Sequence, residues 1–125
     1  PKRECICPDQ RLSAYRARVS GPLADRFDLR VEVPRAAAQG GPGEPSERVA
    51  ARVAAAHALV TERWPPLDGA AERLLAEAAE RLLLSARGRD RMRRVAGTIA
   101  ALDQRGQAGE DDVAEALAYR LELTR

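Results

Sequence analysis

The chain reads RDRMRRVAGTIAAL from Arg89 to Leu102, and this stretch decides which kind of fold the sequence predicts. Its apolar residues recur at intervals of three and four, the spacing that places side chains on one face of a helix. A turn is expected on either side of it, at residues 85–88 and at residues 104–109. The side chains predicted to face inward are Met92, Val95, Ala96, Ile99 and Leu102.

Three neighbouring stretches have the same helical period. The first is expected to begin with Ser46 as its N-cap and to end near Trp64, and the second has Asp68 as its N-cap. The last opens with three acids, where negative charge complements the helix dipole. Residues 46–125 are therefore predicted to form an all-α, four-helix domain. The remaining inward residues are predicted to be Val49, Val53, Ala56, Val60, Ala71, Leu74, Leu75, Ala78, Leu82, Val113, Ala116, Leu117 and Leu121.

The first 45 residues predict a short helix, one strand and a linker. Residues 9–19 have helical spacing, whereas apolar and polar residues alternate over Phe27–Pro34, as in a strand. A single strand needs a partner, and none follows, so its sheet is expected to precede Pro1. Residues 36–45 are rich in glycine and proline. The predicted division is a remnant of a larger core at 1–35, a linker at 36–45 and a helical domain at 46–125.

Composition excludes several classes of function. The 125 residues suffice for one modest core, and a net charge of +2 is small for a general nucleic-acid binder. The sole lysine is Lys2, so no glycine-rich loop carries the lysine that reaches nucleotide phosphates, and no apolar strand ends in Asp-Glu to hold magnesium. The chain alone is expected not to hydrolyse ATP. Without a run of roughly 18 apolar residues, it is expected to be soluble, cytoplasmic and independent of membranes.

The most specific string is SGPLADRFDLRVEVP, from Ser20 to Pro34. It resembles the magnesium chelatase ATPase subunit and, more closely, the competence protein ComM group of AAA+ ATPases. The pattern there is Ile-Ser-Gly-Pro-Leu-Leu-Asp-Arg, an apolar residue, Asp-Leu, and then Val-Glu-Val-Pro. Val19 and Ala24 are mild departures from it. The end of the chain, Glu115–Arg120, is similar to the closing Glu-Ala-Leu-x-Tyr-Arg of the group, so the resemblance spans almost the whole chain.

The resemblance implies a role for Arg26. It occupies the position of the arginine finger, which reaches from one ring subunit into the nucleotide site of the next. A guanidinium is permanently charged and forked, which suits the charge that develops on a transferring phosphoryl group. Without the resemblance, the residues favour a plainer interpretation, in which Arg26 pairs with Asp25 or Asp28 at the entrance of the strand.

A second matching string runs from Leu84 to Leu102, and five of its eight residues from Arg87 to Arg94 are arginine. The family carries Leu-Ser-Ala-Arg, a further arginine, and then Arg-Val-Ala-Arg-Thr-Ile-Ala-Asp-Leu. The resemblance implies that Arg87 is the sensor 2 arginine, which contacts the γ-phosphate from the lid domain, and that Arg91 helps to bind the nucleotide. Gly97 replaces an arginine of the family and Ala101 an aspartate.

The two cysteines match half of a family motif. In the ComM group a Cys-x-Cys follows an earlier Cys-Pro-Cys-Gly, and four such thiolates could hold zinc. Cys5 and Cys7 would supply two of these ligands in the parent protein, and no metal is expected on this chain alone. The family also has a longer connection after Arg63 than this chain has. His57 lies beside an apolar stripe without the partners of a catalytic set.

The leading hypothesis is a lid and sensor fragment of an AAA+ ATPase, a four-helix lid preceded by one helix and one strand of the core. Its partners would be the upstream core and the neighbouring subunits of a hexameric homo-oligomer. ATP and Mg²⁺ would be cofactors of the parent, with neither expected on this fragment, and DNA remodelling would be the parent's task. The chelatase branch would instead imply magnesium insertion into a porphyrin. Two alternatives stay open: a free-standing helical module that binds nucleic acid or an acidic partner through residues 87–94, and a packing domain with solvated charges.

Overall fold

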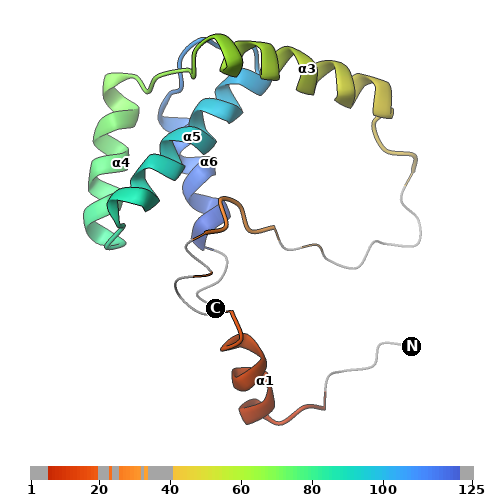
Figure 1. The fold of residues 1–125 in the computed structure, drawn as a ribbon, viewed down its shortest axis with the longest axis vertical. Helices are drawn as coiled ribbons and strands as arrows, with labels where there is room; N and C mark the ends of the chain where they lie inside the picture. The colour runs from red at the N-terminus through yellow and green to blue at the C-terminus, as the bar shows by residue number, and fades with distance from the viewer. Residues whose placement is uncertain (1–5, 20–22, 24–25, 32, 34–40, 122–125) are drawn as a thin grey trace.

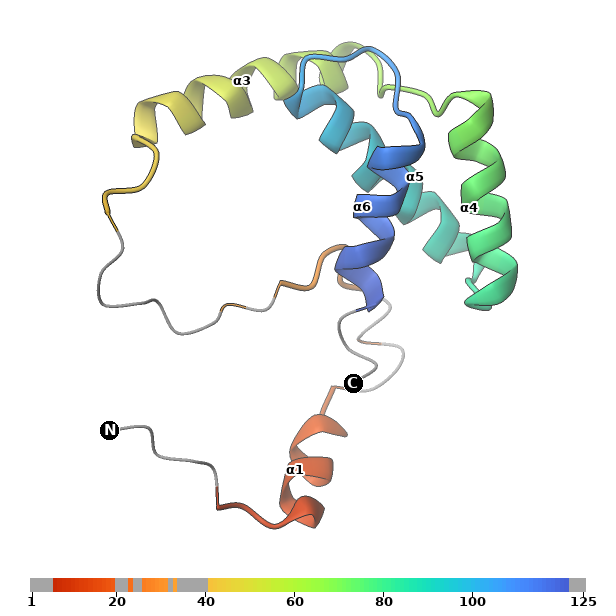
Figure 2. The ribbon, with the colours of Figure 1, turned by 180° about the vertical axis from the view of Figure 1, so that it is seen from behind.

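The structure, a computed structural model, describes residues 6–19, 23, 26–31, 33 and 41–121. Over these residues the chain is helical: α1 (Asp9–Arg16), α3 (Ser46–Glu62), α4 (Gly69–Arg81), α5 (Ala86–Leu102) and α6 (Glu110–Leu121). Helix α5 is central and contacts α3, α4 and α6, while α4 also contacts α6 (Figure 1). Seen from behind, α1 again stands apart from the other helices (Figure 2). The predicted all-helical class is confirmed for the described part of the chain.

The core lies between α4, α5 and α6 and is built largely from alanine. Its largest fully buried side chains are Leu75, Met92 and Val113, one from each helix. Small side chains let the helices approach closely, so a modest number of larger residues fills the space. Five alanines are completely buried in the same cluster: Ala71, Ala96, Ala100, Ala108 and Ala116.

Helix α3 is attached differently from the other three. Among the described helices it contacts only α5, and Ala56 is its only buried residue. Val49 and Val53, which were predicted to face inward, are 37% and 52% exposed. The helix lies across the end of α5 and extends away from the core (Figure 1). A four-helix lid therefore stays a prediction, while three of its helices form the core seen here.

The predicted strand is absent from the described residues 27–31 and 33, and its Pro34 lies outside the described residues. Phe27, Leu29 and Val31 are each half exposed or more. The backbone N–H and C=O groups of a strand need a second strand beside them, so the alternating pattern cannot form a sheet within this segment. Residues 36–40 of the predicted linker also lie outside the described residues, and residues 41–45 are exposed and non-helical.

The N-cap residues explain where α5 and α4 begin, and the start of α5 differs from the prediction. Helix α5 begins at Ala86 rather than near Arg89, because the Ser85 hydroxyl caps it by accepting the Gly88 N–H at 3.1 Å. Gly88 was predicted to break the helix, but it lies buried within the first turn, where its backbone donates to that cap. The Asp68 cap is confirmed, since its carboxylate accepts the Ala71 N–H at 2.7 Å.

Other boundaries differ by one to three residues. Helix α1 ends at Arg16 instead of Val19, and no described helix packs against it to extend it. Ser46 is the first residue of α3 rather than its cap, because Pro45 takes the N-cap position and no side chain caps this end. Leu82 follows the last residue of α4 and is 39% exposed, so it is not part of the predicted inward stripe.

The short connection between α3 and α4 is held against α5. The Trp64 indole N–H donates to the Arg94 carbonyl oxygen at 3.1 Å. A Cβ on Gly97 would lie 2.5 Å from Trp64 Cδ1 and 3.0 Å from the carbonyl oxygen of Pro65, so only glycine fits there without displacing the indole. Gly97, which replaces an arginine of the family that the sequence resembles, therefore packs against the short connection that contains Trp64.

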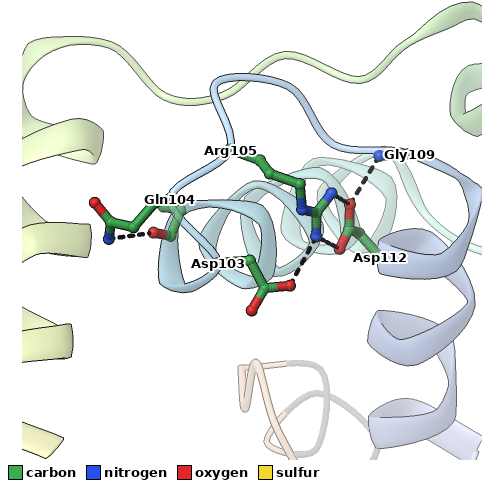
Figure 3. Close-up of polar contacts among 6 residues, drawn as sticks. Asp103, Gln104, Arg105, Gly109 and Asp112 are labelled. Carbon is green, nitrogen blue, oxygen red and sulfur yellow. Dashed lines mark hydrogen bonds and ion pairs between the residues drawn. The ribbon is translucent and has the colours of Figure 1, made fainter. Parts of the chain in front are cut away.

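A polar network fixes the start of α6. Asp112 is 3% exposed, and its carboxylate accepts two bonds from the Arg105 guanidinium, at 2.7 and 2.6 Å (Figure 3). The same carboxylate accepts the Gly109 N–H at 2.8 Å, and Arg105 also donates to Asp103 at 3.0 Å. The bonds from Arg105, followed by the bond from Gly109, hold the pKa of Asp112 below its usual value. Asp112 therefore stays ionised although it is buried.

We expect Asp112→Ala to lower the free energy of unfolding by about 2–4 kcal/mol, since removing one partner of a buried pair costs roughly 3–5 kcal/mol and the partial exposure of Arg105 reduces this. Chemical denaturation followed by circular dichroism measures the change. Asp111→Ala, in the same turn but exposed, is the control and should cost under about 1 kcal/mol. Equal stability of the two variants at neutral pH would contradict the assignment.

The same network predicts how stability depends on pH. Because folding lowers the pKa of Asp112, its contribution is fully present above the ordinary value of 3.8 and is lost as the pH falls through the lower, folded value. The difference in stability between the native chain and Asp112→Ala should therefore be constant near neutrality and shrink below about pH 4.

Candidate functional site

Helix α5 begins with arginines where helices usually place acids. Its first turn contains Arg87 and Arg89 and no acidic residue, whereas the first turns of α3, α4 and α6 each contain at least one acid. The free N–H groups at a helix N-terminus carry partial positive charge, and arginines add to that charge instead of compensating it. An anion placed here would relieve the repulsion.

Four side chains from successive turns of α5 line one pocket of about 310 Å³: Arg87, Asp90, Arg91 and Arg94. Their spacing of three and four residues puts them on one face of the helix. Three guanidinium groups and one carboxylate leave the pocket with excess positive charge. Guanidinium groups suit phosphate because their forked N–H groups match its oxygens.

Arg91 is the most buried arginine of this pocket, with 15% of its side chain exposed. Its Nε atom lies 3.1 Å from Asp28 Oδ1. Its Nη1 atom is buried and has no hydrogen-bond partner within the described structure. A buried N–H group without an acceptor costs roughly 1–3 kcal/mol, so this guanidinium retains capacity for a further acceptor.

A fourth guanidinium lies near the start of α5. Arg120 Nη1 is 3.6 Å from the point that a Cβ on Gly88 would occupy, so the last turn of α6 meets the first turn of α5. The sequence match at Glu115–Arg120 gave Arg120 no role. Arg120 lies close to the start of α5 because α5 and α6, which are consecutive helices, pack against each other. Predicting this proximity requires knowledge of how the two helices pack, which the sequence motif does not provide.

The predicted site residues do not all come together. Arg87 and Arg91 share the pocket, whereas Arg26 does not line it. Arg26 is exposed, and its backbone N–H donates to the Leu23 carbonyl oxygen at 2.9 Å. Asp28 pairs with Arg91, so the plainer interpretation, an Arg26–Asp28 pair, is not what the described residues show. Asp25, the other partner considered, lies outside the described residues.

The cysteines and the histidine form no site in the described part of the chain. Cys5 lies outside it, and Cys7 is exposed beside α1. Within the described residues, no three His, Cys, Asp or Glu side chains are grouped so as to hold a metal ion. His57 Nδ1 lies 3.4 Å from the Thr61 hydroxyl on exposed helix surface. None of the described helices combines the length and apolarity needed to cross a bilayer.

Comparison with known proteins assigns the family. The model for the magnesium chelatase subunit ChlI C-terminal family matches residues 43–120, and the model for magnesium chelatase, subunit ChlI, matches residues 1–40. An uncharacterised protein of Mycobacterium tuberculosis is 36% identical over 140 residues, which covers 94% of this chain and 28% of that protein. The Salmonella typhimurium protein YifB is 31% identical over 134 residues, covering 91% and 26%. Competence protein ComM of Haemophilus influenzae is 34% identical over 131 residues, covering 89% and 26%. No solved structure matches the chain.

The chain spans about a quarter of the length of these relatives. The mycobacterial match extends over 140 residues although this chain has only 125, so that relative carries residues within the matched region that are missing here. Extra residues in the relative agree with the expectation that this chain has a shorter connection near Trp64 than the family has. The two family models and the similarity to YifB and ComM lead to one conclusion: the chain belongs to the magnesium chelatase subunit ChlI family.

Proposed function

We propose that this chain is the lid and sensor part of an AAA+ ATPase and that it contributes arginines to an ATP site formed mostly by other sequence. Arg87 acts as sensor 2 and contacts the γ-phosphate, and Arg91 helps to bind the nucleotide. The observation that carries the proposal is the pocket on the N-terminal half of α5, which Arg87, Arg91 and Arg94 line on a helix whose first turn contains no acid. Family membership supports the same assignment.

The proposal divides the chain as the sequence suggests. Residues 1–35 belong to the end of the AAA+ core, residues 36–45 link the two parts, and residues 46–125 form the helical lid. Arg26, in the first part, acts as the arginine finger on a nucleotide held by the neighbouring subunit of a homo-oligomeric, hexameric ring. The exposed apolar residues Phe27, Leu29 and Val31 agree with a segment that completes a sheet of the core.

The parent protein supplies the rest of the site. A phosphate-binding lysine and an acid for Mg²⁺ come from sequence outside this chain, and the relatives, about four times as long, have room for them. The donor set here fits that division, because guanidinium groups bind phosphate but do not bind Mg²⁺. One relative is named competence protein ComM. We propose DNA remodelling in the cytoplasm as the task of the parent.

The test compares this chain with the same chain extended by its natural upstream sequence. We expect ATP hydrolysis, measured as phosphate release, by the extended protein and none by residues 1–125 alone. We also expect no tight DNA binding by residues 1–125, since Arg91 and Arg93 are paired with Asp28 and Glu72. Hydrolysis by the short chain would contradict the proposal. Salt-sensitive DNA binding by the short chain, without ATPase activity in the long one, would favour a free-standing nucleic-acid module instead.

A further inference from the structure

We infer that Asp28 and Arg91 are positioning residues that fasten the segment bearing Arg26 to helix α5, so that the arginine acting on the neighbouring subunit moves with the helix that senses the nucleotide of its own subunit. The inference rests on the proposed function. Asp28 is assigned no contact with the nucleotide, whereas Arg91 both holds Asp28 and, as proposed above, helps to bind the nucleotide. The two residues are 63 positions apart in sequence, and their side chains meet at the face of α5 that carries Arg87.

Three consecutive residues lie against the helical domain, and two of them are bonded to it. Asp28 Oδ1 lies 3.1 Å from Arg91 Nε on α5. Leu29 lines a largely apolar pocket of about 390 Å³ together with Trp64 and residues of α5 and α6. The Arg30 backbone N–H donates to the Tyr119 carbonyl oxygen on α6 at 3.2 Å. The segment is therefore held by an ion pair to α5 and a backbone hydrogen bond to α6, and Leu29 between them lies at the apolar pocket.

The attachment lies close to both proposed nucleotide contacts. Arg26 precedes Asp28 by two residues, a distance of at most about 7 Å along the backbone. Arg87 precedes Arg91 by four residues, about one helical turn or 6 Å along the axis. The Asp28–Arg91 pair thus joins the two arginines through two short stretches of chain. A displacement of α5 would be transmitted to Arg26 through this pair.

Arg91 is better suited to this role than the other paired arginines. The paired side chains of Arg52, Arg93 and Arg105 are 43–47% exposed, whereas that of Arg91 is 15% exposed. Water screens a charge pair less when one partner is largely buried, so this contact is screened less than the pairs of Arg52 and Arg93, while Arg105, whose partner Asp112 is buried, does not line the α5 pocket. The buried Nη1 atom of Arg91 has no hydrogen-bond partner in the described structure. An oxygen of a phosphate bound in the adjoining pocket would accept a hydrogen bond from it. Arg91 could then hold Asp28 and sense the nucleotide with one guanidinium.

The experiment uses the protein with its upstream sequence and the variants Asp28→Asn, Asp28→Glu and Arg91→Lys. We expect Asp28→Asn to lower kcat for ATP hydrolysis about 10-fold and to reduce the Hill coefficient towards 1, while the Kd for ATP changes less than about 2-fold. Asp28→Glu should restore much of both. Arg91→Lys keeps the charge but loses the fork, so it should lower kcat and the Hill coefficient as Asp28→Asn does and should also raise the Kd for ATP, because Arg91 is proposed to bind the nucleotide as well. The control is Glu72→Gln, which breaks the exposed ion pair between Glu72 on α4 and Arg93 on α5. It should change neither kcat, nor the Hill coefficient, nor the Kd for ATP.

A second measurement reports the attachment directly. Hydrogen exchange of the peptide containing Arg30 should accelerate in Asp28→Asn and stay unchanged in Glu72→Gln, because only the first variant frees the segment. Asp28 is 64% exposed and outside the core, so the variant keeps the fold, as circular dichroism will verify. Wild-type kcat, Hill coefficient and exchange in Asp28→Asn would overturn the inference. If Arg26→Ala and Arg87→Ala also keep full hydrolysis, the proposed function itself fails, which separates the two outcomes.

Discussion

Replacing Arg26 by alanine in the extended protein is expected to lower kcat for ATP hydrolysis by about 10³- to 10⁵-fold, the range found for arginine fingers, with little change in the Kd for ATP. The physical reason is that the guanidinium meets charge that develops only in the transition state. Arg26 suits this role because it is exposed and lies outside the pocket formed by the arginines of its own α5.

A mixing experiment tests whether Arg26 acts between subunits. Arg26→Ala subunits are combined with subunits that lack the phosphate-binding lysine, so that some interfaces contain an intact finger beside an intact nucleotide site. Phosphate release should rise above that of either variant alone. Arg52→Ala is the control, since this exposed arginine pairs with Glu44, does not line the α5 pocket and should leave hydrolysis unchanged. Full activity of Arg26→Ala, or no gain on mixing, would contradict the assignment.

Replacing Arg87 by alanine should lower kcat by about 10²- to 10³-fold, the usual effect of removing one preorganised donor to a developing charge. It should also reduce the preference for ATP over ADP, because only ATP has the γ-phosphate that Arg87 is proposed to contact. Isothermal titration calorimetry with ADP and a non-hydrolysable ATP analogue measures this ratio. Arg87→Lys should recover only part of the activity, since an ammonium lacks the planar fork.

The matched control for Arg87 is Arg89. Both residues are exposed arginines in the first turn of α5, but only Arg87 lines the pocket. Arg89→Ala should therefore retain kcat within about 2-fold and leave the ratio of ATP to ADP affinity unchanged. Equal losses in the two variants would mean that general positive charge at this helix end matters, and not a specific contact by Arg87.

Much of the helical structure could be predicted because it depends on local signals. The helical periods of α4, α5 and α6 and the Asp68 cap depend on residues that are close in sequence. The structure confirms these three helices and the cap. The predicted strand is not seen in the described residues 27–31 and 33, because alternation shows only that a segment is able to pair, and not that a partner is present. The start of α5 differs from the prediction because glycine usually breaks a helix, whereas the Ser85 cap and close packing place Gly88 inside the first turn.

The candidate site was predictable only in part for a similar reason. Arg87, Arg91 and Arg94 share a helix face, so their convergence follows from spacing alone. The pairing of Arg91 with Asp28 does not, because many acids and arginines in this chain could pair and only the fold selects these two. The exposure of Val49 and Val53 on α3 could not be predicted from the sequence either. Their helical spacing is the same whether or not another helix covers them.

The packing of Trp64 against Gly97 makes the protein its own spectroscopic reporter. Trp64 is the only tryptophan in the chain, and its indole N–H is bonded to the carbonyl oxygen of Arg94, a residue of the α5 pocket. Indole emission changes with hydrogen bonding and with exposure to water, and this side chain is 45% exposed. A displacement of α5 relative to the α3–α4 connection would therefore change the emission of a single fluorophore, with no dye attached.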